Sequence, residues 1–127
     1  MRSILLLALA IATASGVGID LTKLPPPAQR TIDFRKDIAP IFQRACQKCH
    51  GAEKQKSGYR LDLKSSALTA GDNYAPNIHP GKSAESPLIH FVAGLDPDMK
   101  MPSKGDPLTN DEISLLRGVS EISWPSE

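Results

Sequence analysis

Apolar residues recur at helical spacing near both ends of the chain, and irregular stretches separate them. The first pattern joins the apolar residues Ile38, Ile41, Phe42 and Ala45. Their i, i+3, i+4, i+7 spacing predicts an amphipathic helix that begins near Asp33 or Asp37 and runs up to the first cysteine. Pro40 is tolerated in a helix only in the first turn, which favours the start near Asp37.

The last helix carries the clearest start signal in the chain. Thr109 to Glu112 reads as a capping box, with Thr109 as the N-cap and Glu112 three residues later. The apolar residues of this segment are Ile113, Leu115, Leu116 and Val119. Gly118 weakens the helix near its end, and Trp124-Pro125 terminates the ordered chain.

Two shorter helices are expected between these ends. Asp62 to Ala70 precedes a glycine, and Ser86-Pro87 to Ala93 precedes another, as helices commonly end. No segment alternates apolar and polar residues with the period of a strand. The pattern therefore predicts an all-α fold.

Composition and charge narrow the class of protein. Aromatic residues make up 5% of the 127 residues, while 11 prolines and 9 glycines imply long irregular stretches. Such a chain buries little apolar surface of its own, and a flat apolar cofactor would enlarge its core. The formal net charge of +1 gives no reason to expect nucleic acid or a strongly anionic membrane surface.

The amino terminus has the features of a secretory signal. Arg2 supplies a positive charge, Ile4 to Ala12 is apolar, and Ala12-Thr13-Ala14 offers a cleavage site. The apolar run is shorter than the ~20 residues that span a bilayer, so no membrane span is expected after cleavage. We therefore predict a signal peptide over residues 1–14, a flexible leader over 15–31, a single domain over 32–127, and a periplasmic or otherwise exported protein.

The candidate chemistry lies in Cys46-Gln47-Lys48-Cys49-His50, a C-x-x-C-H motif. Two thiols one helical turn apart can form thioethers with the two vinyl groups of one haem. The histidine that follows then lies beneath the iron and can ligate it. The motif predicts covalent haem c, held by Cys46 and Cys49, with His50 as the proximal iron ligand.

Cysteine and histidine residues at this spacing also occur in three other kinds of site. A redox dithiol expects a βαβ context that this pattern lacks. A zinc site needs a fourth ligand, which His79 or His90 could supply, so the ligand count leaves zinc open. A disulfide across so short a loop would stabilise little and would leave His50 without a role.

The second side of the iron has four candidate ligands, which are Met99, Met101, His79 and His90. Met99 and Met101 stand in a proline-bounded loop, and residues two apart in an extended segment point to opposite sides. Pro102 fixes the path beside Met101 and favours it modestly. Both methionines could instead fill gaps in the core, as methionine often does.

The chain also resembles a known family in an ordered set of short motifs. These are Phe34 to Ile41, Cys46 to Gly51, Leu61-Asp62, Pro80-Gly81, Ser86 to Leu88, Met101-Pro102, Gly105, Leu108-Thr109, Glu112-Ile113 and Leu115 to Arg117. In this combination, over about residues 32–118, the sequence is similar to planctomycete-type cytochrome c domains. Ser103 and Val119 depart from the family pattern, which has a second proline and a tryptophan there.

The resemblance implies a small cytochrome c-like domain of short helices and loops wrapped around one covalent haem, with Met101 as the distal ligand. Histidine and methionine ligation raises the reduction potential and keeps small substrates from the iron. An electron carrier is therefore expected rather than an enzyme. The alternative is a haem-based enzyme or gas-sensing module with a labile distal ligand.

Further contacts of the haem are predicted more loosely. The carbonyl of Pro80 is a candidate acceptor for the second ring nitrogen of His50, and Arg60 and Tyr59 could contact the propionates. Basic residues are dense from Arg44 to Arg60. If they ring the haem edge, they would favour redox partner proteins with an acidic docking surface.

Overall fold

A computed structural model describes residues 18–121, with side chains described through residue 119. The predicted signal peptide and the predicted end of the last helix at Trp124-Pro125 lie outside the described residues. No helix in the described part of the chain is both long and apolar enough to cross a membrane.

Short helices joined by long loops make up the described residues. The α-helices are α1 (Ala39–Ala45), α2 (Lys64–Thr69), α3 (Pro87–Val92) and α4 (Asn110–Glu121). The other helical turns are η1 (Leu21–Lys23), η2 (Phe34–Ile38), η3 (Lys56–Gly58) and η4 (Ser83–Glu85), of which η2 is π-helical. Between residues 18 and 121 there is no strand, and His50 and Gln55 form an isolated antiparallel bridge. The all-α prediction is thereby confirmed.

The first helical segment begins in two steps, which match the two starts that the sequence allowed. The Asp33 side chain accepts a hydrogen bond from Lys36 N at 3.1 Å and caps η2. α1 then begins at Ala39, which leaves Pro40 in its first turn, where a missing N–H is harmless. Cys46 is the C-cap of α1, so the helix delivers the chain directly to the C-x-x-C-H motif.

The predicted capping box opens α4. Thr109 N donates to Glu112 Oε2 at 2.9 Å, and Glu112 N donates to Thr109 Oγ1 at 3.2 Å. The two middle helices are also confirmed, and both are shorter than expected. α2 begins two residues after Asp62 because Leu63 is still extended, and α3 has Ser86 and Ala93 as its caps.

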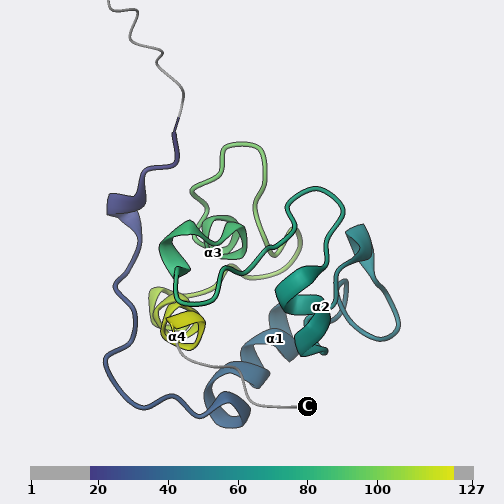
Figure 1. Ribbon diagram of the computed structural model, residues 1–127, viewed down its shortest axis with the longest axis horizontal. Helices are drawn as coiled ribbons and strands as arrows, with labels where there is room; N and C mark the ends of the chain where they lie inside the picture. Colours follow the sequence, from purple (N-terminus) through teal and green to yellow (C-terminus); the bar gives the residue numbers. More distant parts are fainter. Residues whose placement is uncertain (1–17, 122–127) are drawn as a thin grey trace, which may run out of the picture.

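One apolar cluster connects all four helices. Its buried members are Ile38, Ile41, Phe42, Cys46, Tyr59, Leu61, Ala67, Ile78, Leu88, Ile89, Val92, Leu108, Ile113, Leu116 and Val119. α3 packs against α4, and α4 also contacts η2 and η4 (Figure 1). Each large side chain buried in this way contributes roughly 1.5–3 kcal/mol, so the cluster holds the loops that carry the candidate site.

The leader runs along the outside of the helices and is attached to α4 (Figure 1). Ala28 N donates to Ser114 O at 2.9 Å. Arg117 donates through one terminal nitrogen to Pro25 O at 2.5 Å and through Nε to Ser83 Oγ at 3.1 Å. The two bonds of Arg117 join the leader and η4 to α4 through one guanidinium group. Whether the leader is flexible stays a prediction.

The close packing of the leader on α4 explains why a glycine stands at position 118. A Cβ at this position would overlap Ile32 Cδ1, and it would lie 3.4 Å from Ala28 O. Glycine therefore lets the leader cross close to α4, although it lowers the intrinsic helix propensity.

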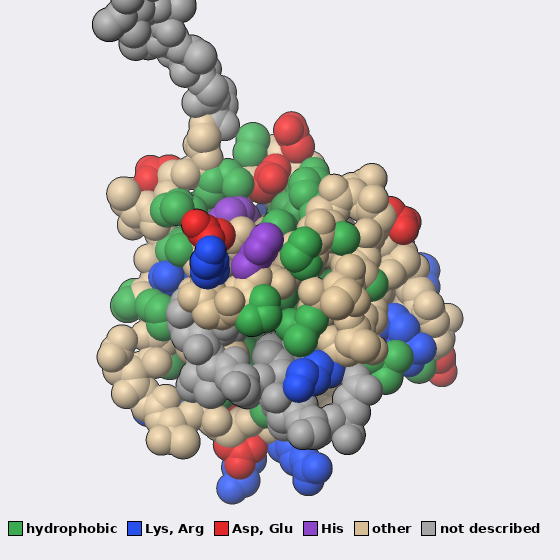
Figure 2. Space-filling view, viewed as in Figure 1, with side chains coloured by type: hydrophobic (Ala, Val, Ile, Leu, Met, Phe, Trp, Pro, Cys, Tyr) green, Lys and Arg blue, Asp and Glu red, His purple; other side chains and the backbone are tan. Residues whose placement is uncertain are grey.

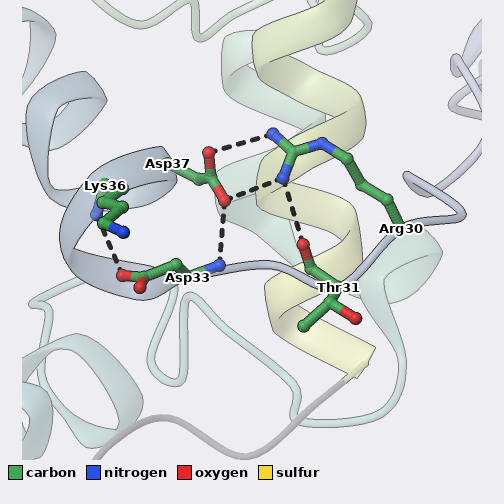
Figure 3. A network of polar contacts seen from close by, with 5 residues as sticks. All are labelled: Arg30, Thr31, Asp33, Lys36 and Asp37. Atoms are coloured by element: carbon green, nitrogen blue, oxygen red, sulfur yellow. Dashed lines mark hydrogen bonds and ion pairs between the residues drawn. The ribbon is translucent and has the colours of Figure 1, made fainter.

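A polar network fixes the point at which the leader meets η2 (Figure 3). The guanidinium of Arg30 donates to both carboxylate oxygens of Asp37 at 2.9 Å, and Asp33 N donates to the same carboxylate at 2.8 Å. The hydrogen bonds from Arg30, and then the one from Asp33, lower the pKa of Asp37 to about 2. The carboxylate therefore stays ionised at any physiological pH.

Candidate functional site

The C-x-x-C-H motif forms a tight turn at the carboxyl end of α1. Cys46 N and Gln47 N both donate to Phe42 O, at 2.9 and 2.8 Å. Cys49 N and His50 N then donate to Cys46 O, at 3.1 and 2.9 Å. The turn therefore continues the helical path and places both thiols and the imidazole within five residues of a fixed helix end.

The segment after the motif is bonded back onto it. Lys56 N donates to Cys49 O at 2.8 Å, and Leu61 N donates to His50 O at 2.8 Å. Gly51 permits the sharp reversal, because a Cβ there would overlap the carbonyl oxygen of Gln47. This close approach of the Gly51 and Gln47 backbones could not be seen from the sequence.

The two cysteines are free thiols in different surroundings. Cys46 is 9% exposed and belongs to the apolar cluster, whereas Cys49 is half-buried. Burial raises the pKa of the Cys46 thiol to about 12, with Arg44 opposing the shift and Glu112 adding to it. An uncharged sulfur, as in a thioether, suits this position better than a thiolate.

His50 is half-buried and its ring is held by packing. Its Nδ1 is buried and has no hydrogen-bond partner within the part of the chain that the structure describes, and its ring meets the edge of Tyr59 with 5.6 Å between centroids. Pro80 is exposed, and its carbonyl does not bond His50 in this structure. The predicted orienting bond is thus not formed here, and a contact between Pro80 and haem stays a prediction.

Arg60 forms an ion pair with Asp62, a partner that the sequence analysis did not predict. Its Nε and a terminal nitrogen donate to the two carboxylate oxygens of Asp62, at 2.8 and 2.5 Å. This hydrogen bonding raises the pKa of Arg60 and lowers that of Asp62. The sequence signal for this ion pair was the acidic Asp62 two residues after the basic Arg60. A role for Arg60 in binding a propionate stays a prediction, and Asp62 would compete for it.

Tyr59 does not present its hydroxyl group for a propionate. The side chain is 5% exposed, and its hydroxyl donates to Ala67 O at 2.9 Å. The polar end of Tyr59 is thus directed into the protein, and the expectation that it faces a propionate is not met.

Met101 lies beside the same apolar cluster that contains Cys46. It is half-buried, packs against that cluster, and its backbone N donates to Phe91 O at 3.1 Å. The carboxyl end of α3 therefore positions the Met101 loop. Met99 is also half-buried, and its backbone N donates to Asp96 Oδ1 at 3.0 Å.

The two other candidate ligands, His79 and His90, lie beside the η4 turn. His90 Nε2 lies 2.6 Å from Ala84 O, within hydrogen-bonding distance, and His79 N donates to Ser86 Oγ at 2.9 Å. Within the described residues, no group of three or more His, Cys, Asp or Glu side chains could hold a metal ion. The four-ligand zinc arrangement that the sequence left open is therefore not assembled here.

An open hollow lies elsewhere, between the leader and α4. It has a volume of about 550 Å³ and is lined by Ala28, Gln29, Arg30, Asp111, Ser114 and Leu115. None of the predicted haem ligands lines it. The hollow is therefore separate from the candidate site.

The residues around the motif fit a covalently held haem. Two free thiols stand on one rigid turn, a histidine with a buried unpartnered nitrogen follows them, and Met101 borders the shared apolar cluster. A haem has an apolar body, so such a cluster is a suitable lining for it. When bound, the haem iron supplies one-electron redox chemistry.

Comparison with protein families gives a match that covers part of the chain. Residues 46–105 match the family described as planctomycete cytochrome C. No curated protein and no solved structure matches. The matched segment begins at Cys46 and includes Met101, and a cytochrome c domain implies covalently bound haem c. The resemblance of the sequence to planctomycete-type cytochrome c domains is thereby confirmed over residues 46–105.

Proposed function

We propose that the protein is an exported one-electron carrier with a single haem c, bound through Cys46 and Cys49 and ligated by His50 and Met101. The observation that carries this proposal is the position of Met101 against the apolar cluster that contains Cys46. The chain has two cysteines, which suffice for one haem with two thioethers.

The protein's own contribution to electron transfer is a fixed geometry. The backbone bonds from Cys49 and His50 to Cys46 O, and from Leu61 to His50 O, prevent the proximal side from rearranging. A site that moves little on gaining or losing an electron exchanges electrons with little reorganisation. Methionine ligation and burial both favour the reduced state and raise the reduction potential.

The basic residues near the motif suggest the chemistry of a partner. Lys48, Lys54 and Lys56 are exposed, and Lys56 is bonded through its backbone to Cys49. Figure 2 shows hydrophobic and histidine side chains in the middle of one face, with lysine and arginine side chains beside the histidines and also towards the lower and right edges. We propose that these lysines attract a redox partner with an acidic docking surface.

A second candidate function uses the same residues. A haem-based enzyme or gas-sensing module would require Met101 to leave the iron easily. The loop location of Met101 favours this alternative, because a loop opens with less free energy than a packed helix. Carbon monoxide distinguishes the two functions, because it binds ferrous iron whose distal ligand is labile.

A redox titration tests the carrier proposal. The full chain, expressed with its amino-terminal signal in a host that matures c-type cytochromes, should titrate reversibly with a one-electron slope and no hysteresis. The rate of reduction by an acidic protein donor should fall as salt is added, and Lys54→Ala with Lys56→Ala should flatten that dependence. A protein that carries haem but cannot be cycled between two stable oxidation states would refute the carrier function.

A further inference from the structure

Tyr59 stands between α2 and the proximal histidine. Its side chain is 5% exposed, and its hydroxyl donates to Ala67 O, a residue of α2 that is fully buried. This hydrogen bond anchors the hydroxyl end of Tyr59 to α2.

The ring of His50 lies against this anchored side chain. The two rings meet edge to face, with 5.6 Å between centroids and 69° between planes. This geometry is favourable for aromatic pairs and contributes about 0.5–1.5 kcal/mol beyond the area buried. The contact therefore defines a preferred orientation of the imidazole.

A histidine that ligates a metal usually donates its second N–H to a carbonyl or carboxylate, which fixes the ring. Nδ1 of His50 is buried and has no such partner among the described residues. The side chains packed on the His50 imidazole therefore determine its orientation.

The backbone keeps Tyr59 in register with His50. Leu61, two residues after Tyr59, donates to His50 O at 2.8 Å, and Tyr59 N donates to Lys56 O at 3.3 Å. Tyr59 is thus held at its backbone by the segment that follows the motif and at its hydroxyl by α2.

From these contacts we infer that Tyr59 is a positioning residue for the proximal ligand. It fixes the plane of the His50 ring, and through it the iron–histidine bond, by packing rather than by hydrogen bonding. This inference rests on the proposed ligation of iron by His50.

The test uses the haem-loaded full chain and compares Tyr59→Phe, Tyr59→Leu and the control Tyr74→Leu. Tyr74 is the other tyrosine of the chain, 40% exposed and in contact with Phe91. The readouts are the midpoint potential and the paramagnetic NMR shifts of the four haem methyl groups in the ferric state, which depend on the plane of the axial histidine. A loss of stability alone changes neither readout.

We expect Tyr59→Leu to change the spread of the four methyl shifts and to lower the potential, because water gains access to His50. Tyr59→Phe keeps the ring but loses its anchor, and should change the methyl shifts in the same sense by less. Tyr74→Leu should leave the methyl pattern and the potential unchanged.

Unaltered methyl shifts and potential in both Tyr59 variants would overturn the inference, and Tyr59→Phe decides alone if Tyr59→Leu does not fold. The wild-type spectrum is recorded first. A wild type without covalent haem overturns the proposed function and this inference together, whereas a normal wild type with unresponsive Tyr59 variants overturns the inference only.

Discussion

The two sides of the proposed haem site are held in different ways. On the proximal side, Cys46, Cys49 and His50 are joined by backbone hydrogen bonds to α1 and to the segment that ends at Leu61. On the distal side, Met101 stands in a loop without helical structure, and its backbone bonds Phe91 O at the end of α3.

This difference assigns a role to each side. Local backbone bonds fix the main-chain path of such a motif with little need for contacts from distant segments. A ligand on a loop depends on the packing of two helices and on a few turn contacts, and such loops open with less free energy than packed helices. The proximal side should therefore determine whether haem is attached, and the distal side should determine its potential and its access to small molecules.

The largest expected effect is on attachment. Replacing both cysteines, Cys46→Ala with Cys49→Ala, should abolish covalently bound haem, measured by haem staining of a denaturing gel and by intact mass. Lys48→Ala changes an exposed residue between the cysteines and should leave attachment intact. Covalent haem in the double variant would show that the motif is not the attachment site.

Next in size is the loss of the proposed distal ligand. Met101→Ala should retain covalent haem but lower the midpoint potential by on the order of 0.1 V, within the range of ~0.8 V over which axial ligands act. It should also let carbon monoxide bind the ferrous form. Met99→Ala is the matched control, and an effect of Met99→Ala equal to that of Met101→Ala would remove the distinction between the two methionines.

A smaller effect is expected from the turn that shapes the distal loop. Asp96 Oδ1 accepts hydrogen bonds from Asp98 N at 2.8 Å and from Met99 N at 3.0 Å. Asp96→Ala should destabilise this loop by about 1 kcal/mol. Amide hydrogen exchange of residues 98–101 should become faster, while exchange in the C-x-x-C-H turn stays unchanged. Asp98→Ala is the control, and equal acceleration on both sides would contradict their independence.

The smallest predicted effect is a pH dependence on the proximal side. Partial burial raises the pKa of Glu112, but the backbone N–H of Thr109 and the Arg44 guanidinium outweigh this and lower it overall. The ionised carboxylate thus stabilises the fold above the unfolded pKa of about 4.3, and this stabilisation is lost as the pH falls through the lower folded value. The side chains of Arg44 and Glu112 are 47% and 22% exposed, so the contribution is about 0.5–1 kcal/mol.

Glu112→Gln isolates this charge, because glutamine also suits the third position of a capping box. Thermal unfolding should show the variant less stable than wild type at pH 7, and the difference should disappear as the pH falls below the folded pKa of Glu112. A stability difference that persists at the lower pH would mean that the ion pair is not its cause.

Local chemistry explains which features could be predicted from the sequence. The capping box of Thr109 and Glu112 and the position of Pro40 in the first turn of α1 depend on neighbouring residues, and both were predicted and found. The observed helix bounds differ from the predicted ones by one or two residues where an extended residue such as Leu63 delays the first turn.

Contacts between distant segments could not be predicted in this way. The attachment of the leader to α4, the close approach at Gly118 and the packing of Tyr59 on His50 depend on how separate segments meet in space. Met101 is an intermediate case. Its neighbours favoured it only modestly, the family resemblance implied a role for it, and its position beside the apolar cluster supports that role without establishing it.

The central claim is that one haem c is held between His50 and Met101, and visible spectroscopy tests it most directly. The full chain, expressed with its signal in a host that matures c-type cytochromes, is measured oxidised, reduced, and reduced under carbon monoxide. We predict a low-spin c-type spectrum that carbon monoxide leaves unchanged. A high-spin spectrum, or a large shift on adding the gas, would contradict stable ligation by Met101 and would favour the sensor or enzyme function.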